Sequence, residues 1–269
     1  MKFISPAKIN LNLSIIGQRD DGYHTLDTLI AFTKWGDEIT IKPSMNFSFT
    51  ADGPYATIFT DDLLSTNRDS SNLITKAVYL MADKAKCDPK VHVHITKNIP
   101  SGYGLGGGSS NAATVMKALN DLWDIGLNMD DFCDIGIHLG AELPVCLHAR
   151  PCRVTGIGEV IQPTSIEKPL QILIVWPDDH LLTKDVFKCF DRNDFSSSDY
   201  TKKNHLTDAA ISLCPEIKEI LDNLNNCEEC DFAQMSGSGS ACFGVFNTIE
   251  SAEKAQSNFK NAVVTTLDA

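Results

Sequence analysis

The most constraining feature of this 269-residue chain is a glycine-rich stretch at 100–113, Pro-Ser-Gly-Tyr-Gly-Leu-Gly-Gly-Gly-Ser-Ser-Asn-Ala-Ala. Apolar residues with helical spacing continue from Ala112 to Trp123 and predict a helix with one buried face. We expect Ser109 or Ser110 to cap this helix, because a serine oxygen can accept a hydrogen bond from an amide of the first turn. A glycine loop that leads into a helix start exposes backbone N–H groups and therefore predicts a phosphate-binding site.

The loop fits neither of the two commonest nucleotide fingerprints. A P-loop needs a lysine immediately before its serine or threonine, and Gly108 occupies that place. The spacing Gly102-x-Gly104-x-x-Gly107 matches the dinucleotide pattern, but the strand expected at 91–95 ends seven residues before Gly102, and that fingerprint starts directly after its strand. A flexible turn at a helix start is the alternative. The density of glycines and the two serines favour a nucleotide-binding loop of a less common design.

Composition limits the partners of the chain. A net charge of −12 and a pI near 4.9 argue against general binding to nucleic acids or anionic membranes, which requires a basic face. No apolar run approaches the ~20 residues of a membrane span, and the first residues lack the apolar centre of a signal peptide. We therefore expect neither nucleic acid nor a membrane as a partner. Separately from this argument, the expected partner is a small-molecule substrate and the expected state is a monomer or homodimer.

The nine cysteines are an odd number and are scattered without a disulfide rhythm, which favours a reducing compartment, the cytoplasm. The motif Cys227-Glu-Glu-Cys230 has no second pair. It is more typical of a helix end followed by a turn than of zinc or redox chemistry.

The order of the expected elements indicates two domains. Strands and helices alternate unevenly in both halves, without a regular βαβ succession, so the predicted fold class is α+β. The best boundary is the stretch 162–168, which divides the chain into domains at 1–165 and 166–269. The expected elements include a helix at 72–86, a strand at 91–95, a helix at 129–139 capped by Asn128, a serine-rich loop at 191–203 and a last helix at 251–262.

Two groups of polar residues precede the loop. Lys8, Asn10 and Asn12 have the period of two that places side chains on one face of a strand, and asparagine is disfavoured inside strands. These residues could hold a charged polar ligand, although a solvated face is the alternative. Tyr23 and His24 follow an Asp-Gly turn and could stack on a ring and hydrogen-bond to it, with ordinary hairpin residues as the alternative.

Three separated blocks resemble the GHMP kinases, a superfamily of small-molecule kinases. They are Pro-Ala-Lys-Ile-Asn-Leu-Asn-Leu at 6–13, the glycine stretch at 100–113 and Met-Ser-Gly-Ser-Gly-Ser-Ala at 235–241. Asp-Gly-Tyr-His at 21–24 and the run from Gly104 to Ala113 resemble the branch whose substrate is 4-diphosphocytidyl-2-C-methyl-D-erythritol. Kinases for another small alcohol, such as mevalonate or homoserine, are the alternative. A non-catalytic nucleotide sensor or an RNA-binding protein is a third possibility, which the acidic composition disfavours.

The resemblance implies an N-terminal ATP-binding domain like domain 2 of ribosomal protein S5 and a ferredoxin-like C-terminal domain. It also implies ATP-dependent phosphorylation of the 2-hydroxyl of this cytidyl diphosphate sugar alcohol, a step of non-mevalonate isoprenoid biosynthesis. ATP and Mg²⁺ are the implied cofactors, with Ser109 or Ser110 near the metal. The implied nucleotide-binding residues are Asn72, Lys97, Pro100, Ser101, Gly102, Tyr103, Gly104, Leu105, Gly106, Gly107, Gly108, Ser109 and Ser110.

The resemblance further assigns Asn10, Tyr23, His24 and Thr183 to the substrate, and Lys8 to the position of the catalytic lysine.

The catalytic acid of the family is an aspartate in a Gly-Ala-Asp-Val-Pro run, where this chain has Gly-Ala-Glu-Leu-Pro at 140–144. Glu142 keeps the carboxylate and adds a methylene. We expect it to be buried before an apolar strand at 145–147 and to act as general base in an adjusted geometry. Two other accounts of this difference are that the chain is a slow kinase or that the base matters little here.

Overall fold

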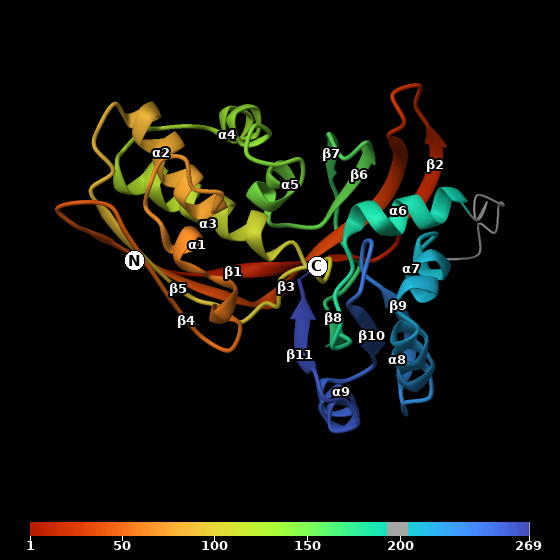
Figure 1. The fold of residues 1–269 in the computed structure, drawn as a ribbon. Coiled ribbons are helices and arrows are strands. Elements are labelled where there is room, and N and C mark those ends of the chain that lie inside the picture. The colour runs from red at the N-terminus through yellow and green to blue at the C-terminus, as the bar shows by residue number, and fades with distance from the viewer. Residues whose placement is uncertain (193–203, 269) are drawn as a thin grey trace. The chain divides into compact units, whose positions relative to one another are not determined.

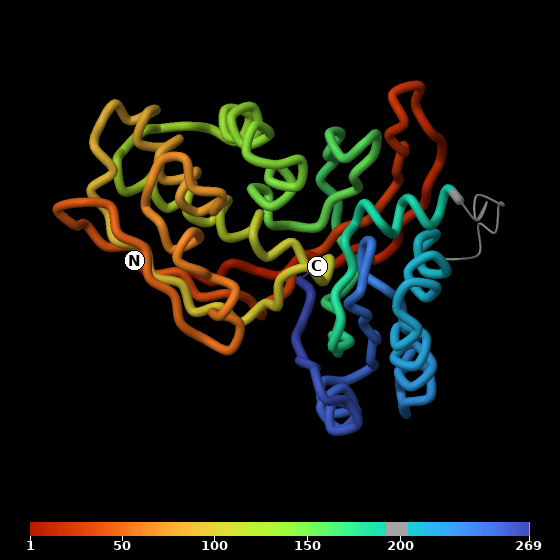
Figure 2. The backbone as a smooth tube through the Cα atoms, in the orientation of Figure 1, coloured from red at the N-terminus to blue at the C-terminus, as the bar shows by residue number. Residues whose placement is uncertain are grey.

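The computed structural model describes residues 1–192 and 204–268. These residues form two compact units, and neither unit is one continuous segment. Unit 1 comprises Met1–Ala7, Trp35–Ser101 and Gly106–Ala149, and unit 2 comprises Lys8–Lys34, Gly102–Leu105 and Arg150–Ala269. Figure 1 labels the elements and Figure 2 traces the backbone. Because the units interleave along the chain, the division into domains at residue 165 stays a prediction.

Unit 1 is a sheet covered by helices. Its strands are the first part of β1 (Lys2–Asn10), the second half of β3 (His24–Pro43), β4 (Ser48–Asp52) and β5 (Val91–Thr96). Strand β5 pairs antiparallel with β3 and parallel with β4. Its residues alternate between buried and half-buried, as period-two side chains on a half-covered sheet must. The helices are α1 (Asp61–Leu64), α2 (Leu73–Ala85), α3 (Gly107–Leu122), α4 (Met129–Gly136) and α5 (Leu143–His148), with the short 3₁₀ turn η1 (Ala56–Ile58).

Figure 1 shows α2, α3, α4 and α5 together on one face of these strands. Local sequence rules account for where two of the helices begin. Asn72 caps α2 by accepting from Ile74 N, and Asn128 caps α4 in a capping box with Asp131. The expected helices at 72–86 and 129–139 are thereby confirmed, the second ending earlier, at Gly136.

The strand expected at 145–147 is wrong, because this segment is the buried helix α5. Pro144 lies in the first turn of that helix, where a missing N–H costs nothing.

Unit 2 is built around a second sheet. Its strands β8 (Leu170–Val175), β9 (Cys230–Met235), β10 (Cys242–Phe246) and β11 (Ala262–Leu267) lie in the order β11-β8-β10-β9, with antiparallel neighbours throughout. Helices α6 (Thr183–Arg192), α7 (Thr207–Leu213) and α8 (Glu216–Asn225) connect β8 to β9, and α9 (Ile249–Gln256) connects β10 to β11. This βαββαβ order confirms the ferredoxin-like fold (Figure 1).

The helix expected at 251–262 is wrong at its C-terminal end. Helix α9 stops at Gln256, and the β-branched residues after Ala262 form strand β11 against β8. The serine-rich stretch 191–203 lies almost wholly outside the described residues, and its first two positions end helix α6. A hydrophobic cluster joins α8 and α9 to the sheet through Leu173, Val175, Ile217, Leu224, Cys242 and Ala252.

The remaining strands of unit 2 are β2 (Ser14–Gln18), β6 (Cys152–Gly156) and β7 (Val160–Pro163), which join the first half of β3. Strands β2 and β6 both pair antiparallel with β3, and β7 pairs with β6. Within the described residues, no helix is long and apolar enough to cross a membrane.

Gly36 allows β1 and β3 to approach within unit 1, and we predict that Gly36→Ala destabilises the protein. An added Cβ would overlap the carbonyl oxygen of Ser5 and lie 2.7 Å from the carbonyl carbon. We expect a loss of about 2 kcal/mol or more in the free energy of unfolding, since backbone atoms on both sides must move. Chemical denaturation followed by circular dichroism measures it.

The matched control is Gly140→Ala, whose added Cβ meets nothing within 4 Å. Equal stabilities of the two variants would contradict the prediction.

Candidate functional site

The helix end of the glycine loop lies in unit 1. Helix α3 begins at Gly107, and its N-cap is Gly106 in the left-handed conformation at φ 65°, so the predicted serine cap is wrong. Ser109 and Ser110 lie inside the first turn instead. Among the described residues no side chain caps this helix end, and its first turn holds no acidic residue. Free first-turn amides and the positive end of the helix dipole favour an anion here.

The two serines differ in what they can still bind. Ser110 is 1% exposed, and its Oγ accepts from Ser5 Oγ over 3.0 Å. Ser109 is half-buried at the start of the helix. No group of three His, Cys, Asp or Glu side chains that could hold a metal occurs in the described part of the chain. Mg²⁺ commonly takes its oxygens from phosphates, waters and a single hydroxyl or carboxylate, and Ser109 suits that role better than Ser110.

A cavity of about 170 Å³ lies next to this helix end in unit 1. Four of the predicted nucleotide residues line it: Asn72, Lys97, Ser101 and Gly108. The remaining lining is mostly apolar and comes from Ile58, Phe59, Leu63, Leu73 and Ile74, with Ser71 and Asn111. A mostly apolar hollow with a few polar groups, beside a helix end that favours an anion, suits a nucleotide, with its base in the hollow and its phosphates at the helix.

Asn72 and Lys97 are both fixed in place. Asn72 caps α2 and also donates from Nδ2 to Leu63 O over 2.7 Å. Lys97 is 3% exposed and forms an ion pair of 2.6 Å with Asp37, which is fully buried. Burial lowers the pKa of Lys97, and the Asp37 carboxylate counters part of this effect.

The other residues of the loop divide between the units. Pro100 is buried, whereas Ser101, in unit 1, and Gly102, in unit 2, are exposed. Tyr103 donates from its hydroxyl to Asp178 O over 3.0 Å, and Leu105 is 1% exposed.

In unit 2 the structure brings together the three sequence blocks. The backbone N of Lys8 donates to Leu105 O over 2.8 Å, which joins β1 to the glycine loop. The backbone N of Asn10 donates to Ser236 Oγ over 3.1 Å, which joins β1 to the turn at 235–241. Residues that are more than 200 positions apart in sequence therefore share one cluster.

Glycine is required where the loop meets this turn. An added Cβ at Gly104 would lie 2.8 Å from Ser236 O and 2.9 Å from Gly239 O, and the residue has φ +75°. An added Cβ at Gly237, at φ +60°, would lie 3.0 Å from Asn10 Oδ1.

Lys8 and Asn10 are buried side by side, with 3% and 4% of their surfaces exposed. Lys8 Nζ donates to Asn10 Oδ1 over 2.7 Å, and Asn10 Nδ2 donates to Thr28 Oγ1 over 2.8 Å. The shared face predicted for Lys8 and Asn10 is confirmed. Asn12 is exposed after the strand, and its Oδ1 accepts from Leu29 N.

Helix α6 presents Thr183, Phe187 and Asp191 along one face, four residues apart. Thr183 Oγ1 lies 2.9 Å from Ser238 Oγ in the turn at 235–241. The ring of His24 stacks on Phe187 with 5.1 Å between centroids, and its Nε2 lies 2.8 Å from Asp191 Oδ1. Tyr23 is 63% exposed.

Glu142 is exposed, not buried as expected. It immediately precedes helix α5, and its backbone carbonyl accepts from Cys146 N over 3.2 Å. The apolar residues of that segment face inward on a helix, so the preceding acidic residue stays at the surface, where the helix N-terminus favours a carboxylate.

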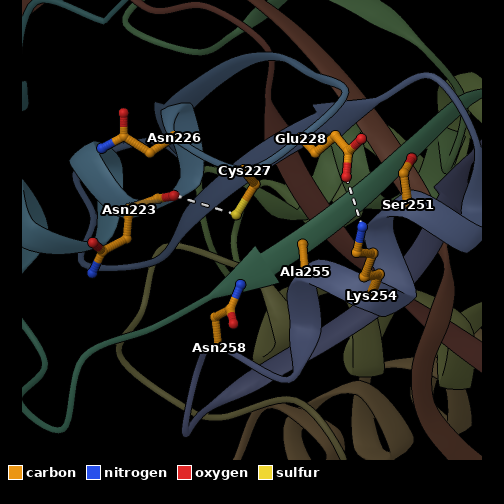
Figure 3. A pocket seen from close by; sticks show the side chains of 8 residues that line it. All are labelled: Asn223, Asn226, Cys227, Glu228, Ser251, Lys254, Ala255 and Asn258. Atoms are coloured by element: carbon orange, nitrogen blue, oxygen red, sulfur yellow. Dashed lines mark hydrogen bonds and ion pairs between the residues drawn. The ribbon is translucent and has the colours of Figure 1, made fainter.

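The CxxC motif takes no part in this cluster. Helix α8 ends at Asn225, and the turn after it carries Cys227, whose thiol donates to Asn223 O over 3.3 Å. Cys227 lines a cavity of about 380 Å³ together with the ion pair of Glu228 and Lys254 (Figure 3). Burial is the main cause that raises the pKa of the Cys230 thiol to about 11, so Cys230 is protonated at neutral pH. The interpretation as a helix end and turn is confirmed.

Sequence reasoning missed Asp37, Phe187, Asp191 and Asn204. The spacing of four from Thr183 was the available signal for Phe187 and Asp191. Asn204 is 2% exposed and donates from Nδ2 to Met235 O and Gly237 O, both over 2.8 Å. Nothing local in the sequence marks this residue as the support of the turn at 235–241.

Comparisons with known proteins agree with this arrangement. The GHMP kinases N terminal domain matches residues 72–149, and the GHMP kinases C terminal domain matches residues 182–265. The 4-diphosphocytidyl-2-C-methyl-D-erythritol kinase of Paramagnetospirillum magneticum is 34% identical over 268 residues, covering 94% of this chain and 89% of that protein. The protein of the same name from Brucella abortus is 38% identical over 263 residues, covering 91% and 85%.

A crystal structure of a 4-(cytidine 5'-diphospho)-2C-methyl-D-erythritol kinase matches with a TM-score of 0.85 and 30% identity, covering 100% of both chains. The mevalonate kinase of Methanococcus jannaschii shares the fold at a TM-score of 0.67 and 15% identity, covering 100% of this chain and 98% of that one. The chain belongs to the GHMP kinases, and within them to the family of the 4-diphosphocytidyl-2-C-methyl-D-erythritol kinases.

We predict that Asn204→Asp disrupts the turn at 235–241. The change replaces two donated hydrogen bonds by a carboxylate oxygen that faces the carbonyls of Met235 and Gly237. We expect a loss of about 1–3 kcal/mol in the free energy of unfolding, as for other buried groups left without a partner. Urea unfolding measures it. Asn223→Asp on the exposed side of α8 is the control, and a loss of the same size there would refute the local explanation.

Proposed function

We propose that this chain transfers the γ-phosphoryl group of ATP to the 2-hydroxyl of 4-diphosphocytidyl-2-C-methyl-D-erythritol, in the biosynthesis of isoprenoid precursors. The observation that carries the proposal is the cluster in which Lys8, the glycine loop and the turn at 235–241 are joined by hydrogen bonds, in a chain of this family. Relatives with this name cover most of the chain, whereas the mevalonate kinases share only its fold.

ATP is assigned to unit 1. We propose that its base enters the cavity lined by Asn72 and Lys97 and that its phosphates bind the amides of the glycine loop and the start of α3. A bound Mg²⁺ would neutralise charge on the phosphate oxygens during transfer. Ser109 is the hydroxyl that we propose for its coordination.

The acceptor is assigned to residues of unit 2. Tyr23 and His24 offer rings for stacking on a pyrimidine, and Phe187 of α6 supports the ring of His24 with 5.1 Å between centroids. Asn10 and Thr183 supply polar groups. The buried ammonium of Lys8 offsets negative charge that develops on the transferred phosphoryl group.

Glu142 is the proposed general base. Its carboxylate takes the proton of the 2-hydroxyl while that oxygen bonds to the γ-phosphorus and the bond to ADP breaks. The side chain is one methylene longer than the aspartate of the family, and it stands at an exposed position directly before α5.

We also propose a cytoplasmic location and a monomeric or homodimeric state. Nine scattered cysteines support a reducing compartment.

The proposed activity is tested with the purified protein, ATP and Mg²⁺ in an assay of ADP release. The cytidyl substrate, mevalonate and homoserine are compared as acceptors. We expect kcat/KM for the cytidyl substrate to exceed the others about 100-fold or more, since a site built for polar groups rejects ligands that leave them unpaired. ADP release of equal rate without any acceptor, or a preference for mevalonate or homoserine, would overturn the proposal.

The role of Glu142 predicts an ordered series of variants. Glu142→Gln removes the base and should lower kcat about 100-fold or more, whereas Glu142→Asp restores the carboxylate of the family and should keep most of the activity. Initial rates at saturating substrates measure the effect. Glu253→Gln on the exposed surface of α9 is the control. Equal rates for the wild type, Glu142→Gln and Glu142→Asp would show that the carboxylate is not used.

A further inference from the structure

Asp37 is a fully buried carboxylate in unit 1 that has no part in the mechanism described above. It stands in β3, one position before Glu38, which pairs with Thr96 of β5. The antiparallel register therefore places Lys97 directly beside Asp37. A buried carboxylate is costly unless every lone pair finds a donor, so its partners show what it holds in place.

Four donors converge on Asp37. Oδ1 accepts from the backbone N of Asn98 and of Ile99, both over 2.7 Å. Oδ2 accepts from Lys97 Nζ over 2.6 Å and from Asn111 Nδ2 over 2.9 Å. These bonds use the acceptor sites of both oxygens. One carboxylate thus fastens the end of β5, the entrance to the glycine loop and helix α3 to one another.

The position of Lys97 makes this carboxylate necessary. Lys97 Nζ also donates to Ile99 O over 2.6 Å, and an added Cβ at Gly107 would lie 3.3 Å from it. The ammonium is therefore held against the first residue of α3, where the helix dipole disfavours a cation. Asp37 supplies the compensating negative charge. The described residues give Lys97 two acceptors, so one of its three protons remains for a ligand.

Asp37 also orients Asn111. A carboxylate only accepts hydrogen bonds, so the atom of Asn111 that faces Asp37 is Nδ2, and Oδ1 is directed elsewhere. Asn111 is 2% exposed, and within the described residues its Oδ1 has no donor. Both Lys97 and Asn111 line the 170 Å³ cavity assigned to the nucleotide.

We propose that Asp37 is a positioning residue of the nucleotide site, which holds the Lys97 ammonium as a donor and the Asn111 amide as an acceptor at the wall of this cavity. The inference rests on the proposed binding of ATP in unit 1. It predicts that the carboxylate of Asp37 governs the affinity for ATP and leaves the affinity for the acceptor unchanged.

The main test is Asp37→Asn, which removes the charge and directs amide protons at groups that are themselves donors. ATP binding is measured by isothermal titration calorimetry without acceptor, and KM for each substrate by initial rates. We expect the Kd and KM for ATP to rise about tenfold or more, as for loss of a hydrogen bond to a charged group, with the KM of the acceptor within about twofold of wild type. Asp52→Asn, a matched change at an exposed aspartate on β4, should leave both values unchanged.

A second comparison tests whether Asp37 acts through Lys97. The double variant Asp37→Asn/Lys97→Gln removes both buried charges and avoids the uncompensated ammonium that could prevent Asp37→Asn from folding. We expect the double variant to bind ATP about as weakly as Lys97→Gln alone. ATP binding within about twofold of wild type in the folded Asp37→Asn variant or in the double variant would overturn the proposal.

The two proposals fail in different ways. If wild-type protein binds ATP but does not phosphorylate the cytidyl substrate, the proposed function fails, and the calorimetry still decides the role of Asp37. If wild type is active and Asp37→Asn binds ATP normally, the role of Asp37 alone is wrong.

Discussion

The close approach of three backbone segments around Gly104 is the constraint on which the unit 2 cluster depends. The loop at 102–105 can lie against the turn at 235–241 only because no Cβ separates Gly104 from the carbonyls of Ser236 and Gly239. The same approach allows Leu105 O to accept from Lys8 N and thereby fixes the backbone from which the Lys8 ammonium extends. The chemistry assigned to Lys8 thus relies on hydrogen bonds of the main chain, which substitutions of neighbouring side chains change little.

In unit 1 the corresponding constraint is the ion pair of Lys97 and Asp37. A buried lysine beside a helix N-terminus is unfavourable on its own, because burial and the dipole both oppose the ammonium. The Asp37 carboxylate offsets part of this cost, and it also accepts from the main chain at Asn98 and Ile99, so the cation and the loop entrance are fixed together. A site arranged in this way before any ligand arrives loses less freedom on binding.

Local rules predicted the parts of the fold that depend on neighbouring residues. The helix at 72–86, the cap at Asn128 and the strand at 91–95 are of this kind, because the atoms involved lie within a few residues of one another. The prediction of a strand at 145–147 was wrong because a short buried apolar run has no period that separates strand from helix. The prediction that Glu142 is buried was wrong because the buried segment after it is helix α5, and Glu142 stands exposed at the start of that helix.

The sequence by itself determined the motifs: a glycine loop before a helix, a lysine and an asparagine on one strand face, and a second glycine-serine turn. Their residue types carry the chemistry, and they sufficed to indicate the family. Only the tertiary structure decided which distant groups support them, since Asn204 beneath the turn and Asp37 beside Lys97 act through contacts across 31 to 74 positions of the chain. Such partners are set by strand register and packing, and these depend on the whole fold rather than on neighbouring residues.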